Sequence, residues 1–201
     1  MNKIISKFRY RKLAFRLALF LILPISLVAV AGTLWLRTSL PGLSENIALR
    51  SLENPVDIIH DSNGIPHINA ESTEDAYRAL GFVHARDRLF QMDFMRRLGA
   101  GRLSEVIGRP TLPLDKTMRT LGLYRLATET VGRLPVEARA ALEAYAAGVN
   151  AFLIARAGAL PPEFIALQYK PEQWTPADSL VWGRLMAMRL AGNWRTEALR
   201  A

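Results

Sequence analysis

The 201-residue sequence contains no cysteine, which excludes disulfide bonds, thiol nucleophiles and cysteine-ligated metal sites. Histidine is also scarce, and His60, His67 and His84 lack the i, i+4 spacing of a zinc-binding helix. No Gly-x-Ser-x-Gly sequence occurs, so the nucleophile elbow of an α/β-hydrolase is not indicated. The sequence has neither an internal repeat nor a low-complexity tract.

Acidic residues are absent from the first 37 positions. Residues 38–201 are nearly balanced, with 19 basic and 18 acidic side chains. The high isoelectric point of about 10.3 therefore belongs to the N-terminus and indicates a membrane surface as partner, not a nucleic acid. The seven basic residues of the N-terminal stretch are Lys3, Lys7, Arg9, Arg11, Lys12, Arg16 and Arg37.

The twenty residues 17–36 carry no ionisable side chain, which matches the length that a helix needs to cross a bilayer. Because most of the basic residues precede this run, the positive-inside rule places residues 1–16 in the cytoplasm and exports the chain after Arg37. We interpret residues 17–36 as an uncleaved inner-membrane anchor that holds the domain in the periplasm or outside the cell. The alternative is a signal peptide cut at Ala29-Val30-Ala31, which would release a secreted protein.

The exported part is predicted to be a linker over residues 37–54 and then one domain over residues 55–201. The domain begins with a predicted β-hairpin, because alternating residues 55–60 and 66–70 flank the turn sequence Asp61-Ser-Asn-Gly64. Helix signals dominate the remainder. The predicted helices run from Ser72 to Arg97 with a Ser72–Asp75 capping box, over Arg102–Ile107 up to Gly108, from Pro135 to Gly158, and from Thr175 onward.

Asp87 is the most unusual residue of the first predicted helix, because it falls on the apolar stripe with Val83 and Phe90. A buried carboxylate needs a partner, since burial alone costs several kcal/mol. Two interpretations are open: a structural ion pair that orients the helix, and a proton-transfer carboxylate. The partner could be Arg86, Arg88, Arg96 or Arg102.

Several short signatures occur in a fixed order and resemble the front half of penicillin acylase-type amidohydrolases. The resemblance covers roughly residues 42–201. It is specific because many signatures match in the same order, although no single match is specific by itself. The main signatures are Gly-Ile-Pro-His-Ile (64–68), His-Ala-Arg-Asp-Arg-Leu-Phe-Gln-Met (84–92), Arg96-Arg97, Gly101-Arg102-Leu103-Ser104-Glu105, the 144–150 segment, Leu-Pro-Pro-Glu-Phe (160–164) and Asn-Trp-Arg-Thr-Glu (193–197).

This family belongs to the N-terminal-nucleophile hydrolases. The resemblance implies an α+β fold, in which this chain is the mainly helical α-subunit part of a four-layer αββα arrangement. It also implies that the catalytic serine begins a second chain, the downstream β-subunit, which is released by self-cleavage. No serine of this sequence is placed as such a start, so no catalytic residue is predicted here, and the fragment alone is expected to be inactive and poorly folded.

The resemblance also suggests a substrate-binding segment in the last predicted helix. Met186, Arg189 and Leu190 match the segment that lines the acyl pocket in the family, and methionine suits adaptable pockets. Leu190 replaces the aromatic residue expected for phenylacetyl recognition, which leaves room for an aliphatic acyl group. The other interpretation makes these ordinary core residues with Arg189 as a surface charge.

By the same resemblance, Glu197 matches the glutamate that binds calcium in the family, whose other ligands come from the second chain. The other interpretation makes Glu197 a charge on a helix surface. Calcium takes six to eight oxygen ligands, so this chain alone would not complete the site. No organic cofactor is implied.

These patterns leave two functional hypotheses. The first is the α-subunit portion of an amidohydrolase that acts on β-lactams or other N-acyl compounds, including acyl-homoserine lactones. The second is a membrane-anchored helical binding or scaffold protein without catalysis.

Overall fold

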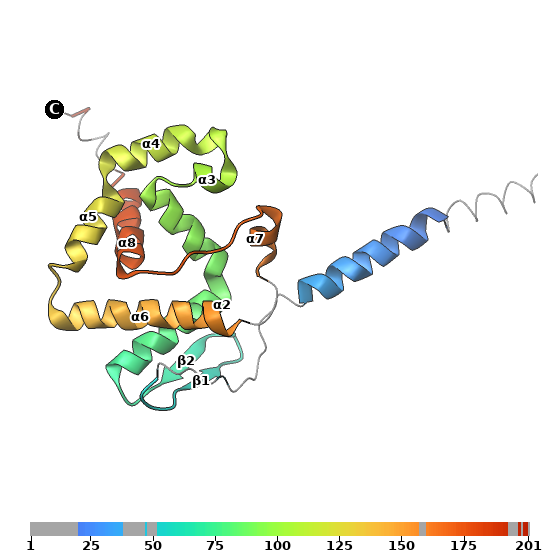
Figure 1. Cartoon of the computed structure of the whole chain (residues 1–201), viewed down its shortest axis with the longest axis horizontal. Helices are drawn as coiled ribbons and strands as arrows, with labels where there is room; N and C mark the ends of the chain where they lie inside the picture. Colours follow the sequence, from blue (N-terminus) through green and yellow to red (C-terminus); the bar gives the residue numbers. More distant parts are fainter. Residues whose placement is uncertain are drawn as a thin grey trace, which may run out of the picture. The chain divides into compact units, whose positions relative to one another are not determined.

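The computed structural model describes residues 20–37, 47, 52–156, 160–192, 197 and 199–200. The chain divides into two compact units, Met1–Leu40 and Pro41–Ala201. In the first unit, residues 20–37 form a helix of 18 residues with a mean hydropathy of 1.9 (Figure 1). Its length and composition would allow it to cross a membrane, and a signal sequence has the same properties. Anchor and signal peptide therefore both stay open, and residues 1–16 lie outside the described part.

The second unit starts with the predicted hairpin. Strands β1 (Asp57–His60) and β2 (Pro66–Asn69) pair antiparallel, with Ile58 opposite Ile68. Asp61 closes the turn, because its Oδ1 accepts hydrogen bonds from the backbone N–H groups of Asn63 and Ile65. Gly64 takes a φ of 77°, which a residue without Cβ adopts at little cost.

Helix α2 (Thr73–Ala100) is the longest element of the second unit among the described residues. Ser72 caps it as predicted, with its hydroxyl accepting from the Asp75 N–H at 3.0 Å. The Asp75 carboxylate has a different role from the predicted capping box, because it accepts from the backbone N–H groups of Glu53 and Asn54. It thereby ties the segment before the hairpin to the start of α2.

Four short elements come next, in the order α3 (Ser104–Ile107), η1 (Arg109–Thr111), α4 (Leu112–Leu121) and α5 (Leu123–Val131). The predicted stop of α3 at Gly108 is confirmed. Asp115 is a buried residue of α4 that holds the start of α3 in place. Its carboxylate accepts hydrogen bonds from the backbone N–H groups of Leu103 and Ser104 at 2.9 and 2.7 Å. Neither α4 nor α5 was predicted from the sequence.

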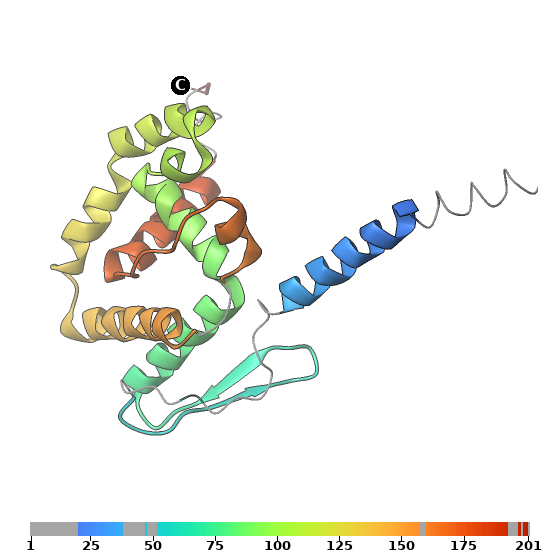
Figure 2. The ribbon, with the colours of Figure 1, turned by 45° about the vertical axis from the view of Figure 1, so that its right-hand side comes forward.

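The last three helices are α6 (Val136–Ala155), α7 (Pro162–Ala166) and α8 (Pro176–Leu190). The predicted starts at Pro135 and Thr175 are confirmed as N-caps. The predicted stop at Gly158 lies outside the described residues. Figures 1 and 2 show α2 crossing α6 and continuing past α8. Helices α4 and α5 lie on the path of the chain from the end of α2 back to the start of α6.

The crossing of α2 and α6 depends on two glycines. A Cβ at Gly81 of α2 would overlap the carbonyl oxygen of Tyr145, and a Cβ at Gly148 of α6 would overlap that of Arg78. The two backbones therefore approach more closely than any pair of larger residues would permit. Beyond the crossing, Phe82 and Phe152 pack edge to face, with ring centroids 5.5 Å apart.

The main core lies between α2, α6, α7 and the segment before α8. Phe164 of α7 is almost fully buried and packs edge to face on Phe90 of α2. The buried members of this cluster are Phe82, Ala85, Leu89, Met92, Ala146, Val149, Phe152, Phe164 and Trp174. The described residues are thus mainly helical with one short hairpin, as predicted, whereas the four-layer fold of a whole enzyme remains a prediction.

Replacing Gly148 with alanine should destabilise the protein by about 1–3 kcal/mol or more, because the added methyl group forces α2 and α6 apart. The chain is produced together with the rest of its precursor, and urea unfolding measures the change in the free energy of unfolding. Gly183→Ala is the matched control, since a Cβ at Gly183 meets nothing within 4 Å in helix α8. The control should gain about 0.5–1 kcal/mol from helix propensity. Equal effects at both positions would contradict the proposed role of the crossing.

Candidate functional site

A groove of about 700 Å³ lies between α2, α6 and α8, and we call it the α2–α6–α8 groove. Its wall is mostly apolar and aromatic, with a few polar groups. Ligand sites commonly have this composition. The lining residues are Tyr77, Leu80, His84, Arg88, Gln91, Met92, Leu134, Ala138, Ala141, Leu142, Tyr145, Trp174, Ser179, Leu180 and Trp182.

A histidine–tyrosine pair forms part of the α2–α6 side of the groove. His84 Nδ1 lies 3.0 Å from the hydroxyl of Tyr145, and the two rings pack edge to face. Burial lowers the pKa of His84, although the nearby Asp87 carboxylate acts in the opposite direction. Burial also raises the pKa of Tyr145 to about 12. Both rings are therefore neutral at pH 7 and offer hydrogen bonding without charge.

Trp174 forms another part of the wall and is held by three hydrogen bonds. Its backbone N–H donates to Asn150 Oδ1 at 2.7 Å, and its carbonyl accepts from Asn150 Nδ2 at 2.9 Å. Its indole N–H donates to the hydroxyl of Ser179 at 2.9 Å. The segment before α8 is thus fixed to both α6 and α8.

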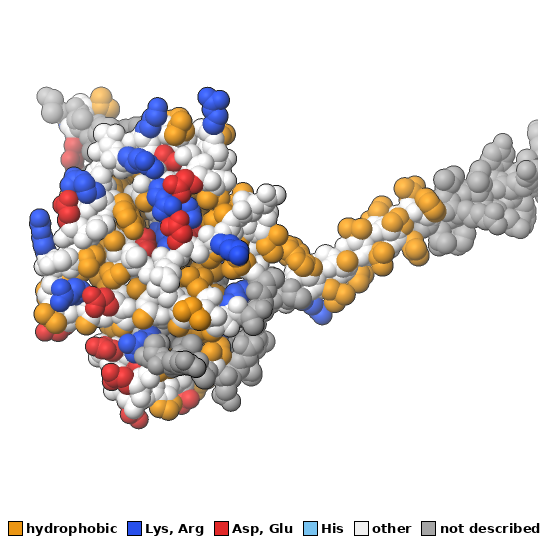
Figure 3. Space-filling view, in the orientation of Figure 1, with side chains coloured by type: hydrophobic (Ala, Val, Ile, Leu, Met, Phe, Trp, Pro, Cys, Tyr) orange, Lys and Arg blue, Asp and Glu red, His pale blue; other side chains and the backbone are white. Residues whose placement is uncertain are grey.

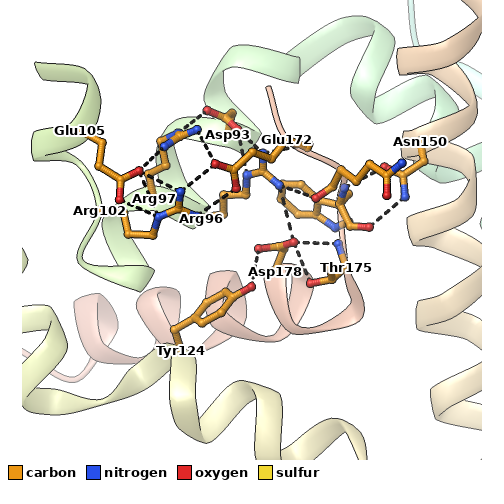
Figure 4. Close-up of polar contacts among 12 residues, drawn as sticks. Asp93, Arg96, Arg97, Arg102, Glu105, Tyr124, Asn150, Glu172, Thr175 and Asp178 are labelled. Atoms are coloured by element: carbon orange, nitrogen blue, oxygen red, sulfur yellow. Dashed lines mark hydrogen bonds and ion pairs between the residues drawn. The ribbon is translucent and has the colours of Figure 1, made fainter. Parts of the chain in front are cut away.

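A network of charged side chains joins α2 to the segment before α8 (Figure 4). The guanidinium carbon of Arg96 lies 5.5 Å from the ring centroid of Trp174. The centre of the network is Asp93 of α2, which is 1% exposed and accepts from Arg96 Nε at 2.8 Å and Arg97 Nε at 2.9 Å. Arg96 also donates to the carbonyl groups of Glu172 and Gln173, each at 2.9 Å. The network therefore neutralises a buried carboxylate and attaches the segment before α8 to α2.

The network reaches the surface at Arg102, Glu105 and Glu172. Arg102 Nη2 lies 2.7 Å from Glu172 Oε1 and 2.8 Å from Glu105 Oε2. The hydrogen bond from Arg102 lowers the pKa of Glu172 to about 2, against the smaller effect of burial. Figure 3 shows acidic and basic side chains intermixed over this part of the molecule.

Asp178 joins the network to the start of α8. Its Oδ2 accepts from the backbone N–H and the hydroxyl of Thr175 at 2.7 and 2.8 Å, and lies 3.6 Å from Arg96 Nη1. Tyr124 of α5 donates to its Oδ1 at 3.3 Å. Saturated ion pairs and hydrogen bonds of this kind hold a scaffold together and leave no free acid or base for chemistry.

The predicted acyl-pocket residues lie at the end of α8, separate from the groove lining. Met186 is 42% exposed, Leu190 is 78% exposed, and Arg189 is also exposed. The neighbouring Met188 is 40% exposed. The end of α8 therefore presents an apolar surface that the described part of the chain does not cover, and the pocket assignment stays a prediction.

The predicted metal ligand Glu197 is exposed, and residues on both sides of it lie outside the described part. No group of three or more His, Cys, Asp or Glu side chains that could hold a metal occurs within the described ranges. A lone carboxylate from this chain fits calcium only as one ligand among several. The three histidines contact different partners: His60 contacts Arg86, His67 contacts Asp61, and His84 contacts Tyr145.

The prediction that Asp87 lies on the buried face of α2 is wrong. Asp87 is exposed and pairs with Arg86 at 3.0 Å, so only the ion-pair interpretation survives, and only at the surface. The reason is that the buried face of α2 is a different one, which carries Ala79, Phe82 and Leu89 at helical spacing, and Asp87 lies off this face. The helix also kinks at Arg88, where φ is −139° and ψ is 23°. After the kink, Leu89, Met92 and Asp93 face the core.

Asp93, Arg96 and Arg97 were not predicted from the sequence as one unit. A signal was present, because an acid with arginines three and four residues later lies on one helix face. The groove itself gave no comparable signal, since its lining comes from segments up to about a hundred residues apart.

Asp93→Asn should cost about 3 kcal/mol or more in unfolding free energy, because Arg96 and Arg97 then lose the carboxylate that balances their buried charge. Asp87→Asn is the matched control on the same helix and should cost only about 0–1 kcal/mol, since its pair with Arg86 is partly exposed. Urea unfolding compares the two variants. A larger loss for Asp87→Asn would overturn the assignment of the central carboxylate.

Residues 55–201 match the family model described as penicillin amidase. Over 159 residues the chain is 42% identical to the penicillin acylase 2 proenzyme of Pseudomonas sp. (strain SE83), which covers 79% of this chain and 20% of that protein. It is 37% identical over 159 residues to the acyl-homoserine lactone acylase QuiP of Pseudomonas aeruginosa, covering 79% of this chain and 19% of that protein. The chain thus spans about a fifth of the length of these curated relatives.

A solved structure, the thermostable penicillin G acylase from Alcaligenes faecalis, matches with a TM-score of 0.61 and 31% sequence identity. The match covers 67% of this chain and 73% of the solved chain. Sequence and fold therefore agree with the resemblance seen in the short signatures, and the chain belongs to the penicillin amidase family.

Proposed function

We propose that this chain is the α-subunit portion of a penicillin acylase-type amidohydrolase, which hydrolyses the bond between an acyl group and an amine. The single observation that carries the proposal is a difference in coverage. The chain spans about a fifth of the curated relatives, one of which is named a proenzyme, whereas most of a separate solved acylase chain aligns with it. This pattern supports a precursor that is cut into chains, with this segment as the first.

In this proposal the catalytic serine begins the downstream chain, the β-subunit. Its hydroxyl attacks the amide carbonyl, and its own α-amino group accepts the proton directly or through water. A free α-amino group has a pKa of about 7.7–8.0, which suits a base near neutral pH. Backbone and side-chain donors of the same downstream chain stabilise the oxyanion. The intermediate then breaks its C–N bond, the α-ammonium group gives its proton to the leaving amine, and water hydrolyses the acyl-enzyme ester to the free acid and the serine hydroxyl.

The α-subunit contributes binding surface and scaffold. Met186, Arg189 and Leu190 form one wall of the acyl pocket, and the exposure of these residues supports a surface that another chain completes. Glu197 supplies one carboxylate oxygen to a calcium ion whose remaining ligands come from the β-subunit. The apolar helix over residues 20–37 directs export and, as an uncleaved anchor, keeps the enzyme at the inner membrane facing the periplasm.

The proposed function leaves open which acyl group the enzyme prefers. Penicillin acylases and acyl-homoserine lactone acylases both occur among the relatives. The aliphatic Leu190 favours an aliphatic acyl chain over phenylacetyl, so N-acyl-homoserine lactones are the leading alternative substrate to β-lactams.

The complete reading frame should yield two polypeptides, the second with serine at its N-terminus. Intact mass measurement and N-terminal sequencing of the purified product test this. A single uncut polypeptide would reject the hydrolase proposal and favour a non-catalytic, membrane-anchored scaffold.

Leu190→Phe should shift the ratio of kcat/KM values toward phenylacetyl amides by about tenfold, because an aromatic wall fits an aromatic acyl group and shortens the space for an aliphatic chain. Ile154→Phe, at an 81% exposed position of α6, is the control and should leave the ratio unchanged. Hydrolysis of phenylacetyl and octanoyl amides of one chromogenic amine measures both. An unchanged preference in the Leu190 variant would remove this residue from the pocket.

A further inference from the structure

Helix α4 turns one face to the core and leaves the opposite face open to water. Leu112, Leu114 and Leu121 are 42%, 39% and 47% exposed. Leu114 and Leu121 lie two turns apart along one edge of the open face, and Leu112 lies near the other edge. The exposed residues of the helix, which we call the α4 face, are Leu112, Pro113, Leu114, Lys116, Thr117, Arg119, Thr120 and Leu121.

The two hydroxyl groups of the α4 face are already satisfied by the helix itself. Thr117 donates to the carbonyl of Pro113 at 3.1 Å, and Thr120 donates to the carbonyl of Lys116 at 2.9 Å. A hydroxyl that has an intramolecular acceptor loses less free energy when water is removed from it. The middle of the α4 face therefore tolerates an environment poor in water, and its leucines favour one.

The charge of this region is positive. Asp115 is the only acidic residue of the sequence between positions 106 and 128, and its carboxylate is buried and bonded to backbone N–H groups. Lys116 and Arg119 lie on the α4 face, and Arg109 is exposed in η1 directly before it. Figure 3 shows basic and hydrophobic side chains together over α4, at the top of the view. Exposed leucines and cations thus share one surface without an exposed carboxylate.

This combination matches a lipid surface with anionic headgroups. Amphipathic helices that lie in the membrane interface place apolar side chains at the acyl boundary and lysine or arginine beside the lipid phosphates. The length of the chain also favours this partner. Residues 38–51 separate the apolar helix over residues 20–37 from the start of the second unit's described part, and a chain of that length spans at most about 50 Å. An anchored chain would therefore keep the second unit close to a lipid surface.

We infer that the α4 face is a second membrane contact, which binds a phospholipid surface with anionic headgroups. Leu114 and Leu121 enter the interface, while Lys116 extends its aliphatic stem along the leucines and its ammonium group to a lipid phosphate. Arg109 adds a second cation at the start of the helix. The inference rests on the proposed anchor over residues 20–37. It adds one preferred orientation of the exported unit on the membrane.

A depth measurement in the full-length protein tests the contact. The fluorescent amino acid Anap replaces Leu114 or, as a control, Val136, which is 68% exposed at the start of α6. The protein is reconstituted into vesicles of phosphatidylethanolamine and phosphatidylglycerol, with and without brominated acyl chains. The reporter at position 114 should be quenched by bromine and the reporter at position 136 should not. No quenching at 114, equal quenching at both positions, or blue-shifted emission at 114 without quenching, which indicates a covering protein segment, would overturn the inference.

Reversal of one charge gives an independent readout. Lys116→Glu should lower the membrane-bound fraction of the α4 face about fivefold or more, because it removes a cation and adds a carboxylate at the lipid surface. Lys170→Glu makes the same change at an exposed lysine of the segment before α8 and should have little effect. Bromine quenching of the reporter at position 114 compares the two variants. Equal quenching in both would contradict the inference.

N-terminal sequencing separates the failure of this inference from the failure of the anchor proposal. A chain cut after Ala31 would reject the anchor, and the released enzyme is then sedimented with the same vesicles. Sedimentation that Lys116→Glu weakens and Lys170→Glu does not would keep the α4 face as a lipid contact, whereas no sedimentation would reject it. An uncut chain without quenching at position 114 would keep the anchor and reject the α4 contact.

Discussion

The close crossing of α2 and α6 is the constraint on which the rest of the second unit depends. Gly81 and Gly148 let each backbone contact the other helix directly, and no side chain larger than hydrogen fits at either contact. This contact places Phe82 against Phe152 on one side and brings Tyr145 to His84 on the other. The core and the groove are therefore two consequences of one backbone contact, and a change in the crossing would alter both.

The charged network around Asp93 is a second constraint, because it holds α8 beside α2. Helix α8 makes its own apolar contacts through Val181 and Leu185, and both lie against Gly99 near the end of α2. The polar half of the attachment comes from Arg96, which donates to two carbonyl groups of the segment before α8 and lies near Asp178. Buried ion pairs contribute little net stability compared with an apolar core, but their directionality fixes one arrangement of the elements. The network thus sets the geometry of the groove wall that Trp174 forms.

Local signals in the sequence predicted the hairpin and the starts of α2, α6 and α8, because turn residues and N-caps act over three or four neighbouring positions. Family signatures predicted the membership, since they depend on order along the chain. The buried face of α2 was predicted wrongly, because the stripe that includes Asp87 and Phe90 is partly exposed, whereas Ala79, Phe82 and Leu89 face the core. The groove was not predictable either, since Tyr77, Tyr145 and Trp182 come together only through the α2–α6 crossing and the attachment of α8.

Apart from the α4 face, two apolar surfaces remain on the folded second unit, the groove and the end of α8 with Met186, Met188 and Leu190. Both lie on helices that the crossing or the network holds against the rest of the unit. A chain that places well-ordered helices behind uncovered apolar walls gains the matching burial energy only when a partner arrives. Under the proposed function, folding of the α-portion and assembly with the downstream portion therefore form one coupled equilibrium. A substitution such as Gly148→Ala would then weaken assembly as well as folding, although Gly148 touches neither uncovered surface.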